Sequence, residues 1–169
     1  MAIPYRVDRE GRGGFTLVEI MIALAIVGIV VMLATSTFQG MMEKYRVEGE
    51  TKQMYADLMD ARGRAMQRNR VFHVQITGNG YATFEDTDPA PDGDISLTGS
   101  DTQVAGVTVK HTITPTAGLS GFRFNRNGIA SATGTIRLSS TALPDYDCIT
   151  IQMTRIKMGQ INAGTCAEK

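Results

Sequence analysis

Hydrophobic residues form one long block near the start of the chain and then become periodic. Residues 15–35 are apolar almost without interruption, about the length that an α-helix needs to cross the hydrocarbon core of a membrane, and Glu19 is the one Asp, Glu, Lys or Arg among them. From residue 36 to residue 70 apolar positions recur at intervals of three and four, which is typical of one face of a helix. No proline occurs between Pro4 and Pro89, so we expect one helix to run through both parts.

The second part of this helix has two distinct faces. One face is expected to pack on the protein's own core and carries Val47, Thr51, Met54, Leu58, Ala61 and Ala65. Nearly opposite lie Gly49, Ala56 and Gly63, spaced by sevens. Small residues let another helix approach closely. This stripe therefore either packs against neighbouring helices or is a solvated face on which small residues are tolerated.

After residue 70 the pattern changes to the alternation of β-strands. Val71–Thr77 and Tyr81–Glu85 flank Gly78-Asn79-Gly80, which is a hairpin signal. Further strands are expected at Ile95–Thr98, Gly106–Thr114, Phe122–Asn125, Ile129–Ser139, Cys148–Thr154 and around Gly159–Asn162. The sequence therefore predicts an α+β fold, in which a long N-terminal α-helix packs on a C-terminal antiparallel β domain of one or two sheets.

The end of the predicted helix is rich in cations. Arg62, Arg64, Arg68 and Arg70 suit the negative end of a helix dipole, and Asn69 can adopt a left-handed cap. These arginines are also candidates for binding the phosphates of nucleic acid. However, they span more than one helical face, and no aromatic residues are interleaved with them for base stacking.

The start of the chain carries a more specific pattern. A charged leader ends in Gly13-Gly14 and is followed by Phe15-Thr16-Leu17-Val18-Glu19 and the apolar helix. This arrangement resembles the processing and assembly signal of type IV prepilins and type II secretion pseudopilins. The resemblance implies that a prepilin peptidase cuts between Gly14 and Phe15 and that Phe15 becomes the methylated amino terminus. It also gives Glu19, a costly charge in a membrane segment, a partner in the amino terminus of a neighbouring subunit.

Two later segments resemble the GspH/FimT branch of minor pilins and pseudopilins. They are the run from Ala61 to Arg70 and residues 122–140 with the strand that begins at Cys148. This resemblance implies a pilin-like structural minor subunit of a type IV pilus, with a type II secretion minor pseudopilin as the alternative. Since some FimT-like pilins are implicated in DNA capture, DNA is a less favoured partner of the arginines.

The same resemblance divides the chain into four parts. Residues 1–14 are the leader, 15–35 the transmembrane and assembly half of the helix, 36–70 its amphipathic half, and 71–169 a periplasmic β domain. The expected partners are other pilin or pseudopilin subunits, a prepilin peptidase, an inner-membrane assembly platform, and the lipid bilayer before assembly. An ordinary secretory signal would need a shorter apolar core and a small-residue cleavage site, and Glu19 would be out of place in it.

The charges and the two cysteines indicate in which compartment the C-terminal domain lies. The 17 Lys and Arg balance the 17 Asp and Glu, so no general attraction to nucleic acid or anionic lipid is expected. A positive leader before the apolar helix predicts that the following domain lies across the membrane. In that oxidising compartment, Cys148 and Cys166 are expected to form a disulfide. Two free buried thiols are the alternative.

Catalytic and metal-binding chemistry find little support. The acidic loop at residues 86–94 carries Asp86, Asp88, Asp92 and Asp94. Their spacing matches no calcium loop and two prolines stiffen the loop, so a solvated loop is favoured over a metal site. No nucleophile elbow or glycine-rich phosphate loop is present in the sequence. We expect no catalytic residue and no cofactor, and a membrane-anchored enzyme is the alternative from a different class.

Overall fold

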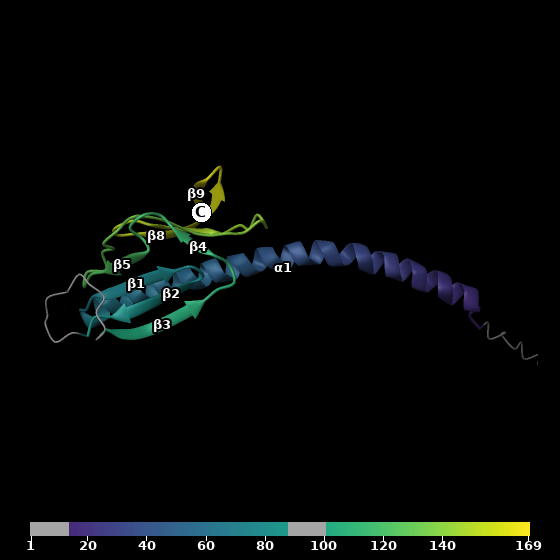
Figure 1. Ribbon diagram of the computed structural model, residues 1–169, viewed down its shortest axis with the longest axis horizontal. Helices are drawn as coiled ribbons and strands as arrows, with labels where there is room; N and C mark the ends of the chain where they lie inside the picture. The colour runs from purple at the N-terminus through teal and green to yellow at the C-terminus, as the bar shows by residue number, and fades with distance from the viewer. Residues whose placement is uncertain (1–13, 88–100) are drawn as a thin grey trace, which may run out of the picture. The chain divides into compact units, whose positions relative to one another are not determined.

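The computed structural model describes residues 14–87 and 101–169. Within them lie one helix, α1 (Leu17–Arg68), and the strands β1 (Phe72–Thr77), β2 (Gly80–Glu85), β3 (Thr102–Thr108), β4 (Ile113–Pro115), β5 (Gly121–Phe124), β6 (Gly134–Leu138), β7 (Cys148–Ile151), β8 (Ile156–Asn162) and β9 (Thr165–Glu168). The chain divides into two compact units between Gln39 and Gly40. The second unit contains the C-terminal part of α1 and every one of these strands (Figure 1).

Both ends of α1 have recognisable caps. At its start, Oγ1 of Thr16 accepts a hydrogen bond of 3.2 Å from the backbone N–H of Glu19, which satisfies one of the orphan donors of the first turn. At its end, Asn69 has a φ of 54°, the left-handed conformation predicted for it. The N–H of Arg70 then donates to the carbonyl of Ala65 at 3.2 Å, as in a Schellman motif.

The part of α1 in the first unit is apolar and exposed. Large apolar side chains from Leu17 to Leu33 are each more than half exposed. By length and composition, α1 is the one helix in the described residues that could cross a membrane. Its assignment runs without interruption past Ser36, where the sequence has no proline.

The strands form two antiparallel sheets. The first sheet has the order β3-β2-β1-β5, and the second has the order β4-β6-β7-β8-β9. The predicted hairpin is confirmed: β1 and β2 pair with Ile76 opposite Tyr81. Gly78 in its turn has a φ of 59°, a left-handed conformation that glycine adopts without steric cost.

One hydrophobic core joins α1 to both sheets. The six residues predicted for the buried helix face are all at most 2 % exposed. Around them pack Phe72, Val74 and Phe122 from the first sheet. Ile136, Ile149 and Ile151 pack there from the second. The α+β prediction is therefore confirmed, with two sheets rather than one.

The prediction of a single strand over Gly106–Thr114 is wrong. After β3 the chain leaves the first sheet at residues 109–112 and joins the second as β4. The N–H of Val109 donates to the carbonyl of Asn79 at 2.8 Å, and that of Lys110 donates to Oε1 of Glu50 at 3.1 Å. Because these partners satisfy the backbone outside a strand, the crossover is stable.

Three other strand boundaries also differ from the prediction. Ile129–Ser139 is too long, because residues 125–130 first turn back onto β5, with Ala130 bridging Phe124, and only Gly134–Leu138 forms a strand. Cys148–Thr154 is too long as well, since β7 ends at Ile151. The strand predicted at Gly159–Asn162 is part of the longer β8, and β9 was not predicted at all. The predicted strand Ile95–Thr98 lies outside the described residues.

Candidate functional site

The residues of the predicted processing signal lie just before and within the first turn of α1. Gly14, Phe15 and Thr16 are non-helical, and the Phe15 side chain is 79 % exposed. Glu19 is the acid of the first turn, where a carboxylate interacts favourably with the positive end of the helix dipole. Glu19 is exposed, so its side chain is accessible to a group from another molecule.

The exposed apolar surface continues beyond this first turn. Side chains such as Met32 and Leu33 are 77 % and 68 % exposed. A contiguous apolar surface of this length is unusual on a soluble monomer and marks a membrane or protein contact. Its chemistry suits contact with lipid or with apolar helices of other molecules.

Polar contacts hold the C-terminal part of α1 against the first sheet. Oη of Tyr81 donates to Oδ2 of Asp57 at 2.5 Å. Burial, followed by this hydrogen bond, raises the pKa of Tyr81 far above its usual range. At the end of the helix, Arg68 forms an ion pair with the buried Glu85. These contacts add polar ties between the helix and the first sheet to the apolar packing of the core.

A second set of contacts holds the other flank of α1 to the segment before β7. Oε1 of Glu48 accepts the N–H of Asp145 at 2.8 Å, and Nζ of Lys44 lies 3.1 Å from Oδ2 of Asp145. The hydrogen bond from Lys44 lowers the pKa of the Asp145 carboxyl. Lys52 lies over the ring of Tyr146, 5.2 Å from its centre.

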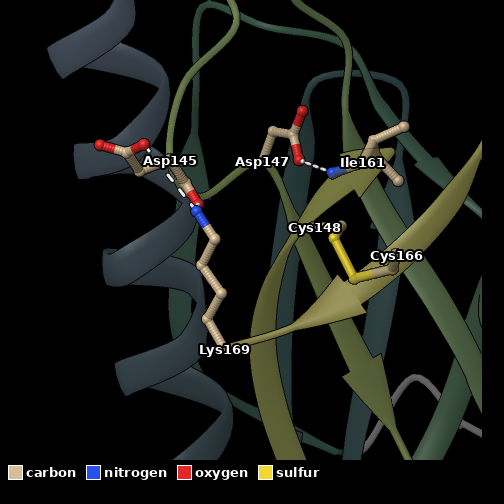
Figure 2. Close-up of a disulfide and its surroundings, with 6 residues drawn as sticks. All are labelled: Asp145, Asp147, Cys148, Ile161, Cys166 and Lys169. Carbon is tan, nitrogen blue, oxygen red and sulfur yellow. Dashed lines mark hydrogen bonds and ion pairs between the residues drawn. A yellow bond between two sulfur atoms is a disulfide. The ribbon is translucent and has the colours of Figure 1, made fainter. Parts of the chain in front are cut away.

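The predicted disulfide ties this same segment to the C-terminal hairpin. Cys148 and Cys166 are bonded, with an S–S distance of 2.02 Å and their Cα atoms 6.1 Å apart. Figure 2 shows two further ties beside it: Oδ1 of Asp147 accepts the N–H of Ile161 at 2.6 Å, and Lys169 reaches Asp145. The disulfide thus links β9 to the start of β7, next to the segment that contacts α1. Neither cysteine is a free thiol in this structure, so that alternative is excluded.

Each of the four candidate arginines has a partner within the chain. Nε of Arg62 donates to the carbonyl of Gly128 at 2.9 Å, and that of Arg64 lies 2.6 Å from Oδ2 of Asp60. Arg68 and Arg70 share the carboxylate of Glu85. The carboxylate partners of Arg64, Arg68 and Arg70 reduce the charge offered to a phosphate backbone, and DNA binding stays a prediction.

The stripe of small residues faces away from the core. Gly49 and Ala56 are exposed, and Gly63 is partly buried. A Cβ added at Gly49 or Gly63 would meet no atom within 4 Å, so the fold of this chain does not itself require glycine there. Contact with another helix stays a prediction for this stripe.

One cluster was missed from the sequence. His111 belongs to no recognisable sequence motif, yet Glu43 and Glu50 of α1 contact both of its ring nitrogens. Glu43 and Glu50 lie seven residues apart on the helix, but nothing local in the sequence links them to His111, more than 60 residues away. Asp88, Asp92 and Asp94 lie outside the described residues, and no metal-binding cluster occurs among residues 14–87 and 101–169.

Two family models match the chain, one over the start of α1 and one over most of the β domain. The model of the type II transport protein GspH matches residues 50–155, more than half of the chain. The chain belongs to the GspH family. The model of the prokaryotic N-terminal methylation motif matches residues 10–35, the region of Gly14, Phe15 and Glu19. The resemblance to minor pilins and pseudopilins is therefore confirmed.

Two solved structures have the same fold as this GspH-family chain. The type IV minor pilin FimU of Pseudomonas aeruginosa is 15 % identical over 70 % of this chain and 91 % of its own, with a TM-score of 0.51. The minor pseudopilin EpsH of the Vibrio cholerae type 2 secretion system is 15 % identical over 68 % and 97 %, also with a TM-score of 0.51. No curated protein sequence matches the chain. The family and both structures are pilin and pseudopilin subunits rather than enzymes.

Proposed function

We propose that this GspH-type protein is a structural minor subunit of a type IV pilus, cut between Gly14 and Phe15, methylated on Phe15 and assembled through α1. A type II secretion minor pseudopilin is the alternative. The C-terminal pair Cys148 and Cys166 resembles pilins more than most pseudopilins and therefore favours the pilus. One observation carries the proposal. The methylation motif at residues 10–35 coincides with the start of an exposed apolar helix whose first turn carries Glu19.

Assembly then moves α1 from lipid into a bundle of apolar helices. One apolar surrounding replaces another, so the transfer changes hydrophobic energy little and packing decides the outcome. A carboxylate buried in such a bundle costs several kcal/mol unless it is paired. The new amino group on Phe15 of a neighbouring subunit supplies the charge that Glu19 needs.

The proposed topology follows from the leader and the disulfide. Arg6, Arg9 and Arg12 precede the apolar helix, and cations of this kind remain on the cytoplasmic side. Residues 71–169 then form a periplasmic domain, where the bond between Cys148 and Cys166 can form and persist. Before assembly the chain is a single-pass inner-membrane protein. Its partners are the prepilin peptidase, the assembly platform and the lipid bilayer, and afterwards other subunits of the filament.

The exposed small-residue stripe supplies a candidate packing surface. Gly49, Ala56 and Gly63 leave open space on α1 into which a neighbouring helix fits. An added Cβ at Gly63 would meet no atom within 4 Å, so Gly63→Leu, with a folding check by circular dichroism, tests packing against a neighbouring helix. The substitution should lower incorporation into fibres, whereas the conservative Gly63→Ala should lower it less. Normal incorporation of Gly63→Leu would contradict this role.

DNA binding is the less favoured function, because all four arginines of the helix end are engaged within the chain. If it occurs, it is led by phosphates and weakens steeply with salt. A gel shift by the detergent-solubilised protein at low salt tests it, with Arg62→Gln and Arg64→Gln as variants. A complete absence of retarded DNA removes this function.

Mass spectrometry of the mature protein tests the core of the proposal. We expect Phe15 as the first residue, with one added methyl group. Gly14→Val, which places a branched side chain at the cut, should leave the leader attached. A mature wild-type protein with an intact leader would overturn the assignment. The choice between pilus and pseudopilus is decided by deleting the gene and measuring surface pili and secreted protein in the same cells.

A further inference from the structure

His111 lies between two glutamates of α1. It belongs to the crossover between β3 and β4, and its side chain is only 7 % exposed. Its Nδ1 lies 2.6 Å from Oε2 of Glu50, and its Nε2 lies 2.7 Å from Oε1 of Glu43. One imidazole ring therefore joins two points of the helix, about two turns apart, to the β domain.

Other charged groups complete this cluster from both elements. Nζ of Lys110 lies 3.0 Å from Oε2 of Glu43, and the backbone N–H of Lys110 donates to Oε1 of Glu50 at 3.1 Å. Within the helix, Nη1 of Arg46 lies 3.6 Å from Oε2 of Glu43. Each carboxylate thus has one oxygen on the ring and its other oxygen on a different donor.

The hydrogen bonds indicate which proton state the ring needs. An ionised carboxylate only accepts hydrogen bonds, so contacts through both ring nitrogens require two N–H donors. Only the imidazolium form has two, because a neutral ring points a lone pair at one of its partners. The hydrogen bond from His111, followed by that from Lys110, lowers the pKa of the Glu43 carboxyl and so favours its ionised form.

The geometry points to His111 as a proton-dependent contact that holds α1 to the β domain. With two ring protons it holds the helix at Glu43 and Glu50 to residues 109–112. Loss of one proton removes a hydrogen bond and opposes a lone pair to a carboxylate at less than 3 Å, so the contact opens. The two glutamates lie in the first turns of α1 after the unit boundary at Gly40. This role goes beyond the proposed function and does not depend on it.

The proton state can be measured directly by NMR. The chain has two histidines, so labelling histidine with ¹⁵N in the full-length protein in detergent micelles gives two rings, and the variant His73→Gln assigns them. Because each ring nitrogen of His111 faces a carboxylate oxygen, we expect both nitrogens to carry a proton when the ring contacts Glu43 and Glu50. An unprotonated ring nitrogen in the folded protein would place the proton on a glutamate instead and overturn the proposal.

The coupling to stability follows from the same proton. If the folded state holds one proton more than the unfolded state, stability falls as pH rises. The unfolding constant then increases by at most about tenfold per pH unit while His111 deprotonates. Urea unfolding of the full-length protein at a series of increasing pH values should show this rise in the wild type and in His73→Gln. The rise should be absent from His111→Gln.

An equal rise in His111→Gln would refute the coupling, because no ring is left to titrate at that position. If His111→Gln does not fold, Glu50→Gln takes its place. It retains an acceptor for the ring but removes one negative charge, so the loss of the second ring proton should move to lower pH in the NMR titration. A titration unchanged in this variant would also overturn the proposal.

Discussion

Removal of the bond between Cys148 and Cys166 tests how much this disulfide contributes to the stability of the folded state. The bond closes a loop with a sequence separation of 18. On the chain-entropy model, a loop of this length stabilises the folded state by about 3 kcal/mol. For a chain of this size, losing that much lowers the melting temperature by roughly 6–12 °C. The double variant Cys148→Ala/Cys166→Ala and the reduced wild type should both show this loss.

Comparing the two forms separates chain entropy from packing. Cys148 is fully buried, so the alanine variant also loses side-chain contacts that the reduced protein keeps. Denaturation of the full-length protein in detergent can be followed by near-ultraviolet circular dichroism of its five tyrosines, because the chain has no tryptophan. A loss below about 1 kcal/mol in both forms would refute the entropic reasoning. It would mean that the Asp147–Ile161 and Lys169–Asp145 contacts hold the hairpin without the disulfide.

Three further predictions concern the β domain and its hold on α1. Leu58→Ala removes a fully buried side chain of the helix and should cost about 2–5 kcal/mol of unfolding free energy by chemical denaturation, against about zero for an exposed control such as Gln53→Ala. Gly159→Ala should lower the melting temperature, because the added Cβ would lie 2.3 Å from the carbonyl oxygen of Ala167; an unchanged value would mean that β9 shifts freely. The hydrogen bond from Lys44 lowers the pKa of the Asp145 carboxyl. This ion pair therefore stabilises the folded state at pH values above the usual carboxyl range, and the stabilisation is lost as Asp145 is protonated at lower pH. In Asp145→Asn, the free energy of unfolding should fall less steeply as the pH is lowered through that range.

The sequence predicts well those features that depend on neighbours along the chain. The buried face of α1 follows from six residues at intervals of three and four, and each of them is buried. The cap at Asn69 and the hairpin turn at Gly78 also depend on local backbone preferences. The methylation motif at residues 10–35 is equally local, and the roles of Gly14, Phe15 and Glu19 within it stay predictions.

What the sequence does not predict depends on contacts between distant residues. The break after β3 is stabilised by Glu50 of α1, which lies far from Lys110 in the sequence. An alternating pattern continues through that break, so periodicity alone indicates one strand. β9 has four residues and an exposed surface, too little for a pattern, and its partners are β8 and a disulfide. His111 was overlooked for the same reason, because only the fold brings its two glutamates to it.

The cap at Thr16 has a consequence for how the leader can be removed. Because α1 begins at Leu17, the peptide bond between Gly14 and Phe15 lies in non-helical backbone. Hydrolysis of a bond within a helix would first need local unfolding of at least one turn. Here the proposed cut leaves every backbone hydrogen bond of α1 intact, since the first of them runs from Ile20 to the carbonyl of Thr16. The proposed cut and the integrity of the helix are thus independent, because a protease can act between Gly14 and Phe15 without unfolding any turn of α1.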